Sequence, residues 1–431
     1  MATRRYPVLA LCLLVLASLT LAGCSKTAGA SVKIALAEVP RESPQLDQGL
    51  LDQQVAANNE FAFDLYRNLA QKDGNLFYSP YSISAAVAMA FAGARGETEQ
   101  QMMATMRYAL PQPQLHQVFN QLDQSLNSTG GEAGGYQLVV ANSLWGQDGF
   151  PFRADFLELI ARNYGAGVRL VDFTSGAKRE AARQEINNWV SEQTNDKIKD
   201  LLRKEMLNDF TRLVLVNAIY FKAEWAEPFF RPYTADAPFT LLSGEPVEVP
   251  TMADDIGADY FQGDGFQAVG LAYKGDRAEM IVIMPEPGTF AEFEAALDRA
   301  TFDRILEGLE PRIVKLYLPK FQFEYSQDLD TSLAEMGMPV AFTGLADFTG
   351  LYDPAGLPPL YISKIAHKTS ITVDEIGTEA SAATGVTMEL MAGHLNELNL
   401  KIDHPFIFAI RDRQTGTILF VGRMVDPREG K

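Results

Sequence analysis

Cysteine is almost absent from this chain. Only two of the 431 residues are cysteines, Cys12 and Cys24, and both lie near the N-terminus. The rest of the chain has no thiol that could form a disulfide, attack a substrate or bind a metal ion. We therefore expect the fold to be held together by packing alone, and we expect neither a metal site nor a cofactor.

Histidine and the usual catalytic signatures are scarce as well. The four histidines are His116, His367, His394 and His404, which leaves few pairs of a nucleophile and a base. The chain contains no Gly-Xaa-Ser-Xaa-Gly elbow, no His-Glu-Xaa-Xaa-His zinc motif and no phosphate-binding loop. These absences argue against an enzyme.

Positive charge is in short supply. The chain has 37 Lys and Arg residues against 55 Asp and Glu residues, so its formal net charge is −18. A protein this acidic is a poor candidate for binding nucleic acid or an anionic membrane surface by electrostatics. We therefore expect no nucleic-acid partner. We also expect the protein to be a monomer.

The N-terminus has the features of an export signal. Arg4 and Arg5 precede an apolar run over residues 8–22 that is too short to span a bilayer comfortably. The run leads into Leu-Ala-Gly-Cys, which resembles a bacterial lipoprotein signal, in which Cys24 would receive lipid and become the first mature residue. The alternative is an ordinary secretory peptide cut at a small residue. On the lipoprotein resemblance, Ser25 after the cysteine implies export to the outer membrane.

The composition and periodicity of the sequence divide the chain into three parts. Residues 1–23 are the predicted signal peptide. Residues 24–55 mix Ala, Ser, Pro, Glu and Gln with little periodicity, and we interpret them as a lipidated N-terminus and flexible tether. Residues 56–428 show no Pro- or Gly-dominated break and no repeat, although length alone favours two or three domains.

The most informative stretch is residues 374–384, Asp-Glu-Ile-Gly-Thr-Glu-Ala-Ser-Ala-Ala-Thr. Read with a period of two from Thr378, it places small residues on one face, while Glu379 falls on the other. Ala, Ser and Gly hold a strand poorly, so such a strand would need a host sheet. A flexible linker between domains is the alternative. The flanking segments 361–373 and 404–411 have strand-like patterns, which would tether the stretch to sheet at both ends.

Four separated segments resemble the serpins, the family of suicide protease inhibitors. The segment HKTSITVDEIGTEASAAT at 367–384 is similar to the hinge of that family, and DHPFIFAIRDRQTGTILFVGRMVDP at 403–427 is similar to its C-terminal strand pair. The segment NLFYSPYSISAAVAMAFAGARGETEQQM at 75–102 resembles the part that lies beneath the main sheet. LVLVNAIYFKAEWAEPF at 213–229 resembles the strand that bears the family's asparagine and tryptophan.

The resemblance implies a fold. It indicates one serpin domain over residues 56–428, with a reactive loop at 375–400. The implied fold class is α+β: a large mixed central β-sheet, additional sheets, surrounding helices and an exposed reactive loop.

The resemblance also implies a hinge at the start of that loop. Glu375 is expected to begin it, Gly377 to be its flexible joint, and Thr378 to be the first residue buried on insertion. The hinge continues through Glu379, Ala380, Ser381, Ala382, Ala383 and Thr384. Ile376 departs from the charged residue that inhibitors often have at this place.

A second set of residues is implied where the sheet must open. At the top of the sheet, Trp225 is expected near Glu375, with Lys320 as the charge partner of that glutamate. Near the centre, His367 and Asn217 are expected to hydrogen-bond over two serines, which are Ser79 and Ser82. This central network either controls opening or only satisfies buried polar groups.

The implied function is irreversible inhibition of a protease. A serine protease would cut the loop after Met391 and before Ala392, with Leu390 as the neighbouring candidate; a count backward from Pro405 points nearer His394. Methionine or leucine fills an apolar specificity pocket, so elastase-, chymotrypsin- or subtilisin-like enzymes are the expected targets.

Other functions remain open on the sequence. Papain-like cysteine proteases are a second class of target. A non-inhibitory serpin that acts as a chaperone or carrier would share the same core, and a lipid-anchored solute-binding protein would fit the signal but not the four ordered segments.

Overall fold

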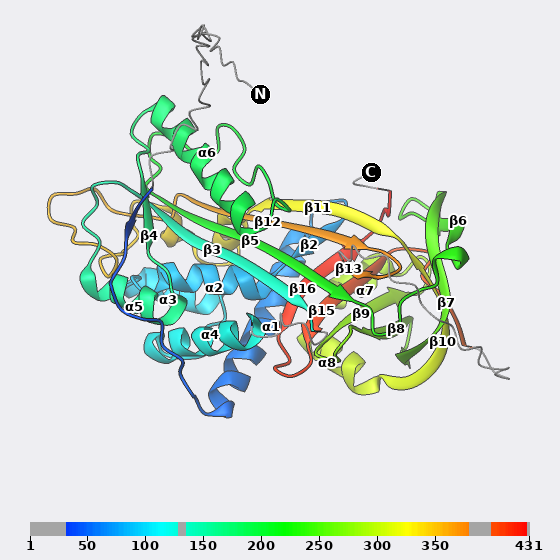
Figure 1. The fold of residues 1–431 in the computed structure, drawn as a ribbon. Coiled ribbons are helices and arrows are strands. Elements are labelled where there is room, and N and C mark those ends of the chain that lie inside the picture. Colours follow the sequence, from blue (N-terminus) through cyan, green and yellow to red (C-terminus); the bar gives the residue numbers. More distant parts are fainter. Residues whose placement is uncertain (1–31, 128–134, 379–397, 429–431) are drawn as a thin grey trace, which may run out of the picture. The chain divides into compact units, whose positions relative to one another are not determined.

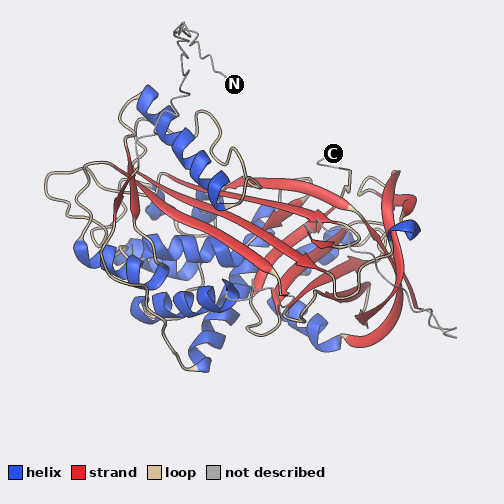
Figure 2. Ribbon diagram, viewed as in Figure 1, coloured by secondary structure: helices blue, strands red, loops and turns tan. Residues whose placement is uncertain are grey.

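The computed structural model describes residues 32–127, 135–378 and 398–428 of the chain. Figure 1 and Figure 2 show that helices and strands are both abundant in these ranges. The helices are α1 (Gln48–Leu69), α2 (Pro80–Phe91), α3 (Gly96–Thr105), α4 (Gln112–Asn127), α5 (Ala154–Tyr164), α6 (Gly176–Gln193), α7 (Phe290–Ala296), α8 (Arg299–Gly308) and α9 (Leu329–Glu335), with short 3-10 helices η1 (Arg231–Tyr233) and η2 (Pro339–Phe342). The predicted α+β class is confirmed.

A seven-stranded mixed sheet, which we call sheet A, contains the predicted hinge. Its strand order is β1 (Lys33–Ala35), β4 (Val168–Val171), β3 (Gln137–Gln147), β5 (Leu213–Glu224), β13 (Gly377–Thr378), β12 (Lys364–Val373) and β11 (Phe321–Asp328). The pairs β3–β4 and β5–β12 are parallel, and the other pairs are antiparallel. Because both faces of β5 are covered, its sequence is an almost continuous apolar run rather than an alternating one.

The second sheet, sheet B, has nine strands. Eight follow one another in the order β14 (Leu398–Lys401), β10 (Glu310–Pro319), β7 (Pro246–Gln262), β8 (Phe266–Ala272), β9 (Ala278–Pro285), β15 (Phe406–Asp412), β16 (Ile418–Met424) and β2 (Leu76–Tyr78). The ninth strand, β6 (Ala235–Thr240), pairs with β7.

Aromatic side chains join the two sheets. Phe77 of β2 stacks on Phe420 of β16 with ring centroids 4.8 Å apart, and Phe221 of β5 meets the same ring at 5.9 Å. All three rings are buried. Burying each aromatic side chain contributes about 2–3 kcal/mol, so this cluster stabilises the packing of sheet B against sheet A near Phe221.

Helix α2 supports the middle of sheet A. All of its residues are buried, and it packs against β3 and β5. The helix begins where its sequence predicts: the Ser79 side chain accepts a hydrogen bond from the Ser82 N–H, and Pro80 occupies the first turn. Helix α6 covers the opposite face of the sheet (Figure 1). The buried start of α2 therefore lies directly beneath the centre of the sheet.

The prediction of a flexible tether over residues 24–55 is wrong from residue 33 onward. β1 adds to the edge of sheet A, and α1 begins at Gln48, where the Asp47 carboxylate accepts a hydrogen bond from the Gly49 N–H. We call residues 33–47 the strap.

Polar contacts to distant residues hold the strap in place. Arg41 pairs with Asp123 of α4 at 2.7 Å, and Glu42 pairs with Arg162 of α5 at 2.8 Å. The carbonyl of Glu42 also accepts a hydrogen bond from the side chain of Asn120 at 2.9 Å. Contacts of this kind leave no periodic pattern in the sequence, which is why the sequence alone indicates a tether here.

The part of the chain that the structure describes contains neither a candidate membrane-spanning helix nor a candidate metal site. Among these residues, no helix is both long enough and apolar enough to cross a bilayer. Nor do they bring together three or more side chains of the types that bind metal ions.

Candidate functional site: the hinge and the centre of sheet A

Strands β5 and β12 pair directly over about half of their length. Along the rest of their length, toward the C-terminal end of each strand, they are separated. Residues 364–369 of β12 pair directly with residues 214–219 of β5. Beyond that point the short strand β13 lies between them, so that Thr378 is opposite both Val373 and Ala223. The expected joint Gly377 and the first residue expected to be buried on insertion, Thr378, are therefore already in the sheet, whereas the sequence interpretation places the whole loop outside until cleavage.

Glycine is required at the first position of β13. A Cβ atom on Gly377 would lie 2.1 Å from the carbonyl oxygen of Ala223, which is far inside van der Waals contact. The absence of a side chain therefore lets β13 approach β5 closely enough to pair with it. This close approach, rather than backbone flexibility, is the structural reason for glycine at the hinge.

Glu375 lies in a polar contact network at the top of sheet A. Its carboxylate accepts hydrogen bonds from Lys320 Nζ at 2.9 and 2.8 Å and from Thr234 Oγ1 at 2.9 Å. The residue is 4% exposed. Burial would raise the pKa of Glu375, but these hydrogen bonds outweigh it and hold the pKa below its usual value. The structure thus brings Lys320 and Glu375 together and keeps the carboxylate charged.

Trp225 holds the backbone of the hinge. Its backbone N–H donates to the carbonyl of Ile376 at 2.8 Å, and its indole Nε1 donates to the carbonyl of Asp374 at 3.0 Å. The indole also stacks on Tyr273 with centroids 4.6 Å apart, and the hydroxyl of Tyr273 lies 2.6 Å from Thr378 Oγ1. Sequence reasoning missed Tyr273, because this contact links β8–β9 to the hinge across 105 residues.

A hydrogen-bond network joins three strands at the centre of sheet A. His367 of β12 lies beside Asn217 of β5 in the strand register, and Asn142 of β3 lies on the other side of Asn217. The Asn217 side chain contacts Nδ1 of His367, the oxygen of Asn142 and, at 2.5 Å, Ser82 Oγ of α2. The predicted group of histidine, asparagine and serines is assembled, and Asn142 is an addition to it.

Asn142 could have been found from the sequence. It is a lone amide in the apolar strand segment Leu138–Trp145, where a buried polar side chain needs a partner. What the sequence could not provide is the register that places it beside Asn217.

The protonation state of His367 follows from its partners. The Ser79 N–H donates to Nε2 at 3.3 Å, so Nε2 has no proton and Nδ1–H donates to the amide oxygen of Asn217. The side chain is completely buried, and burial lowers its pKa to about 3. His367 is therefore neutral at physiological pH, and its bond to Asn217 directly joins the two strands that a new strand would have to separate.

The reactive segment lies outside the described residues. This applies to Met391, Ala392, Leu390, the hinge residues from Glu379 to Thr384 and the lipidation candidate Cys24. The described ends of the segment are informative, because Thr378 lies in sheet A and Leu398 begins β14 in sheet B. The segment between them connects the two sheets.

His404 hydrogen-bonds the chain that follows the reactive segment to the end of β9. Its Nδ1 lies 2.7 Å from the Asp403 carboxylate and its Nε2 lies 2.7 Å from the carbonyl oxygen of Pro285. Both partners only accept hydrogen bonds, so both bonds form only when the imidazole carries two protons. Burial lowers the pKa of His404, but these two acceptors outweigh it and raise the pKa above its ordinary value.

This geometry predicts a loss of stability on the alkaline side. The folded pKa of His404 is above its unfolded value of about 6.5, so its contribution is complete below that pH and is lost as pH rises through the folded pKa. The buried neutral histidines act in the opposite window, because their lowered pKa values remove stability as pH falls toward 3. The contribution of His404 to the midpoint of thermal unfolding should therefore decrease between about pH 6 and pH 8, and it is measured as the difference in midpoint between the wild type and a variant that cannot titrate at this position.

The matched variant for this test is His404→Gln, which can donate one hydrogen bond but cannot titrate. We expect the difference in unfolding midpoint between the wild type and this variant to shrink as pH rises from about 6 to about 8. An unchanged slope in the variant would assign the pH dependence to another group.

Comparisons with known proteins agree with this geometry. The model of the family described as "Serpin (serine protease inhibitor)" matches residues 56–427. An uncharacterized serpin-like protein of Thermococcus kodakarensis is 42% identical over 379 residues, which cover 87% of this chain and 86% of that protein. The leukocyte elastase inhibitor of Equus caballus is 38% identical over 389 residues, covering 88% of this chain and 100% of the inhibitor.

Solved structures give the same result. The native state of the thermophilic serpin tengpin superposes with a TM-score of 0.80 at 28% identity, covering 92% of this chain and 100% of that one. Human thyroxine-binding globulin complexed with thyroxine superposes with a TM-score of 0.79 at 32% identity, covering 88% of this chain and 100% of the globulin. With a split central sheet, a hinge between β5 and β12 and matches of this extent, the chain belongs to the serpin (serine protease inhibitor) family, which is not a family of enzymes.

Proposed function

We propose that this serpin is an irreversible suicide inhibitor of serine proteases. The observation that carries the proposal is the position of β13, which lies between β5 and β12 and is continuous with the reactive segment. A polypeptide that continues from Thr378 meets the place where β5 and β12 part. Its extension along the sheet requires only that the pairing of residues 364–369 with residues 214–219 be broken.

The proposed mechanism uses the protease's own chemistry. The catalytic serine of the target attacks the carbonyl of Met391, the peptide bond to Ala392 breaks, and the new N-terminal amine leaves as the acyl-enzyme forms. The segment after Thr378 is then tethered at one end only, so it can extend β13 between β5 and β12. The protease is carried along with it and is distorted before water can release it. Strand insertion by serpin loops is a known example of strand addition.

The energetics favour insertion. About ten new ladder hydrogen bonds at roughly 1 kcal/mol each provide on the order of 10 kcal/mol. The cost is the opening of six residue pairs between β5 and β12 and of the His367–Asn217 contact. The inserted strand replaces these pairs on both of its edges, so the balance remains favourable and the step is irreversible in practice.

The direct test is formation of a covalent adduct. Incubation with pancreatic or neutrophil elastase should give a one-to-one adduct that survives denaturant, because the acyl bond persists once the protease is distorted. Elastase whose catalytic serine has been blocked is the control and should give none. Cleaved serpin with fully active protease would falsify the inhibitory proposal and favour a chaperone or carrier function instead.

A specificity prediction tests the position of the reactive bond. Met391→Arg should give inhibition of trypsin, because arginine pairs with the aspartate of the trypsin specificity pocket and methionine cannot. We expect the rate of trypsin inhibition to rise roughly a hundredfold or more, since a pocket built for a charged group strongly rejects an apolar one.

The control for this test is Met391→Leu, which should keep the response to elastase. If trypsin responds to Leu390→Arg and not to Met391→Arg, the cleaved bond lies one residue earlier. Papain should be assayed in parallel, because a papain adduct would extend the targets to cysteine proteases.

We also propose that the protein is exported and is anchored by lipid on Cys24 to a bacterial membrane, namely the outer membrane. The supporting observation is the sequence of the N-terminus, in which an apolar run ends in small residues and a cysteine. Incorporation of labelled fatty acid into the wild type and not into Cys24→Ala would support lipidation; equal labelling of both would refute it.

A further inference from the structure

The strap fixes where the anchored chain meets the folded part. β1 runs antiparallel to β4, with Lys33 opposite Leu170. At that end of sheet A, β3 and β4 also finish and β5 begins, since Gly146 pairs with Leu213. We call this the β1 end of the sheet. The opposite end, where Gly377 pairs with Glu224, is the hinge end.

The two ends are far apart compared with the available chain. Figure 1 shows β4 and β13 at opposite ends of the sheet. From Leu213 to Glu224, β5 covers eleven residue steps, or about 36 Å at roughly 3.3 Å per residue. From Cys24 to Lys33 there are nine steps, which span at most about 30 Å when fully extended. A lipid on Cys24 therefore cannot reach back past the hinge end.

The surface at the β1 end has exposed apolar side chains. Seven large hydrophobic residues are exposed in the described part of the chain, and four belong to this end: Ile34, Leu36, Phe210 and Leu345. Phe210 is 71% exposed and Leu345 is 83% exposed. The segment of Phe210 is tied to the start of β5, because the carbonyl of Phe210 accepts from Tyr361 Oη and the Ser363 N–H donates to the carbonyl of Leu213. The segment that leads to Leu345 joins the same place, because the Ile362 N–H donates to the carbonyl of Ala341 at 3.0 Å.

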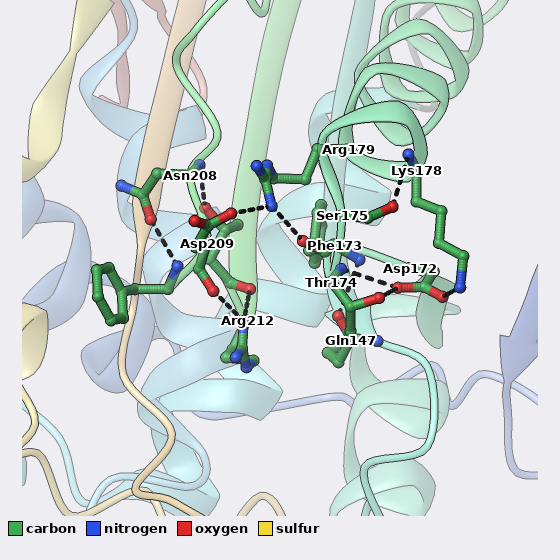
Figure 3. Close-up of polar contacts among 12 residues, drawn as sticks. Gln147, Asp172, Phe173, Thr174, Ser175, Lys178, Arg179, Asn208, Asp209 and Arg212 are labelled. Atoms are coloured by element: carbon green, nitrogen blue, oxygen red, sulfur yellow. Dashed lines mark hydrogen bonds and ion pairs between the residues drawn. The ribbon is translucent and has the colours of Figure 1, made fainter.

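Hydrogen bonds hold the loop of Phe210 in a defined conformation. The Phe210 N–H donates to Asn208 Oδ1 at 2.9 Å, and Arg212 Nη1 donates to the carbonyls of Asp209 and Thr211 at 2.9 and 2.7 Å. Arg179 of α6 adds an ion pair to Asp209 and a hydrogen bond to Phe173 (Figure 3). A loop fixed by this many bonds presents an exposed aromatic ring at a defined place.

Charge at this end is balanced. Lys178 pairs with Asp172 at 2.6 Å, Lys33 pairs with Asp148 at 3.5 Å, and Arg179 pairs with Asp209. Although the whole chain has a net charge of −18, these pairs leave little excess negative charge here to be repelled by anionic lipid headgroups.

We propose that the β1 end of sheet A faces the membrane, with Phe210 and Leu345 in the lipid interface, and that the hinge end, with Gly377 and Thr378, lies away from the bilayer. This inference rests on the proposed lipidation of Cys24. Aromatic and aliphatic side chains at a membrane surface add their own burial energy to that of the lipid chains, so the two contacts reinforce each other. The chain that leads from Thr378 to the reactive bond then begins on the side of the protein distant from the membrane.

The absence of cysteine from the mature domain makes a clean test possible. In the full-length lipidated protein, Phe210→Cys and Leu345→Cys each provide a single reactive thiol for an environment-sensitive fluorophore, since Cys24 is occupied. The matched control is Leu242→Cys. Leu242 is an exposed leucine that follows β6, and the last residue of β6, Thr240, donates its N–H to the carbonyl of Asp403, which lies after the reactive segment. The vesicles contain phosphatidylethanolamine with a minor fraction of phosphatidylglycerol and, in a second set, a spin-labelled quencher lipid.

The expected result is a blue shift at positions 210 and 345 on vesicles, quenched by the spin-labelled lipid, and neither effect at position 242. The lipid-free Cys24→Ala background should abolish the shift. A response at 242, or none at 210 and 345 in vesicle-bound protein, would overturn the orientation. Protein that is not lipidated and does not bind vesicles would overturn its premise as well. Elastase adduct formation, measured on the same samples, reports the inhibitory function separately.

Discussion

Cleavage of the reactive loop should raise the midpoint of thermal unfolding by on the order of 10–20 °C. Insertion is expected to add about 10 kcal/mol, and 1 kcal/mol moves the midpoint by about 1–2 °C in a chain of this size. The rise has a specific structural cause: β13 has two residues in the uncut protein, and extension along β5 and β12 would make it a full strand. Scanning calorimetry of intact and cleaved protein measures the difference.

The protease chosen for this measurement matters. A metalloprotease that cuts the loop forms no acyl-enzyme, so it releases cleaved serpin without being trapped. The control is the same sample cleaved outside the loop, for example within the N-terminal 32 residues, which should melt like the intact protein. If loop-cleaved protein melts no higher than uncut protein, the intact fold stores no free energy and the inhibitory mechanism has no driving force.

Thr378→Arg should convert the inhibitor into a substrate. Thr378 is 1% exposed, and its hydroxyl lies 2.6 Å from that of Tyr273. Burying an unpaired guanidinium there costs several kcal/mol, and each 1.4 kcal/mol changes the competition between insertion and release about tenfold. We expect the yield of elastase adduct to fall by more than a factor of ten and the heat stabilisation after cleavage to be lost.

A failure to fold would give the same loss, so two further variants are needed. Thr378→Ser keeps the hydroxyl and should remain an inhibitor. Ala380→Arg lies outside the described residues, but the two-residue period places position 380 on the face of Thr378 once the strand forms. It should become a substrate while its uncut form unfolds like the wild type. Full adduct yield from Ala380→Arg would contradict insertion along this face.

The sequence was informative where a local pattern or a family motif carries the contact. The Lys320–Glu375 pair and the His367–Asn217 pair could both be named before the structure, because the resemblance to the serpins implied both of them. The start of α2 could be derived from capping chemistry at Ser79 and Pro80 alone. Gly377 and Thr378 lie in sheet A, but the rest of the alternating stretch is outside the described residues, so its entry into a host sheet stays a prediction.

The parts that could not be predicted depend on register and on distant polar contacts. Asn142 joins the central network only because β3 and β5 align it with Asn217. The strap contains no helical or strand period, and its pairing of Arg41 with Asp123 crosses 82 residues of sequence. The early entrance of Gly377 into sheet A depends on a backbone approach that no side-chain pattern reveals.

The position of β1 has a consequence for handling the protein. β1 covers backbone groups of β4 that would otherwise form an open sheet edge, and open edges pair with the strands of other molecules. A recombinant version begun at residue 56, where the family match starts, would lose this cover together with the first turns of α1. Aggregation of such a truncated protein would then reflect a bared edge strand rather than any defect of the inhibitory machinery.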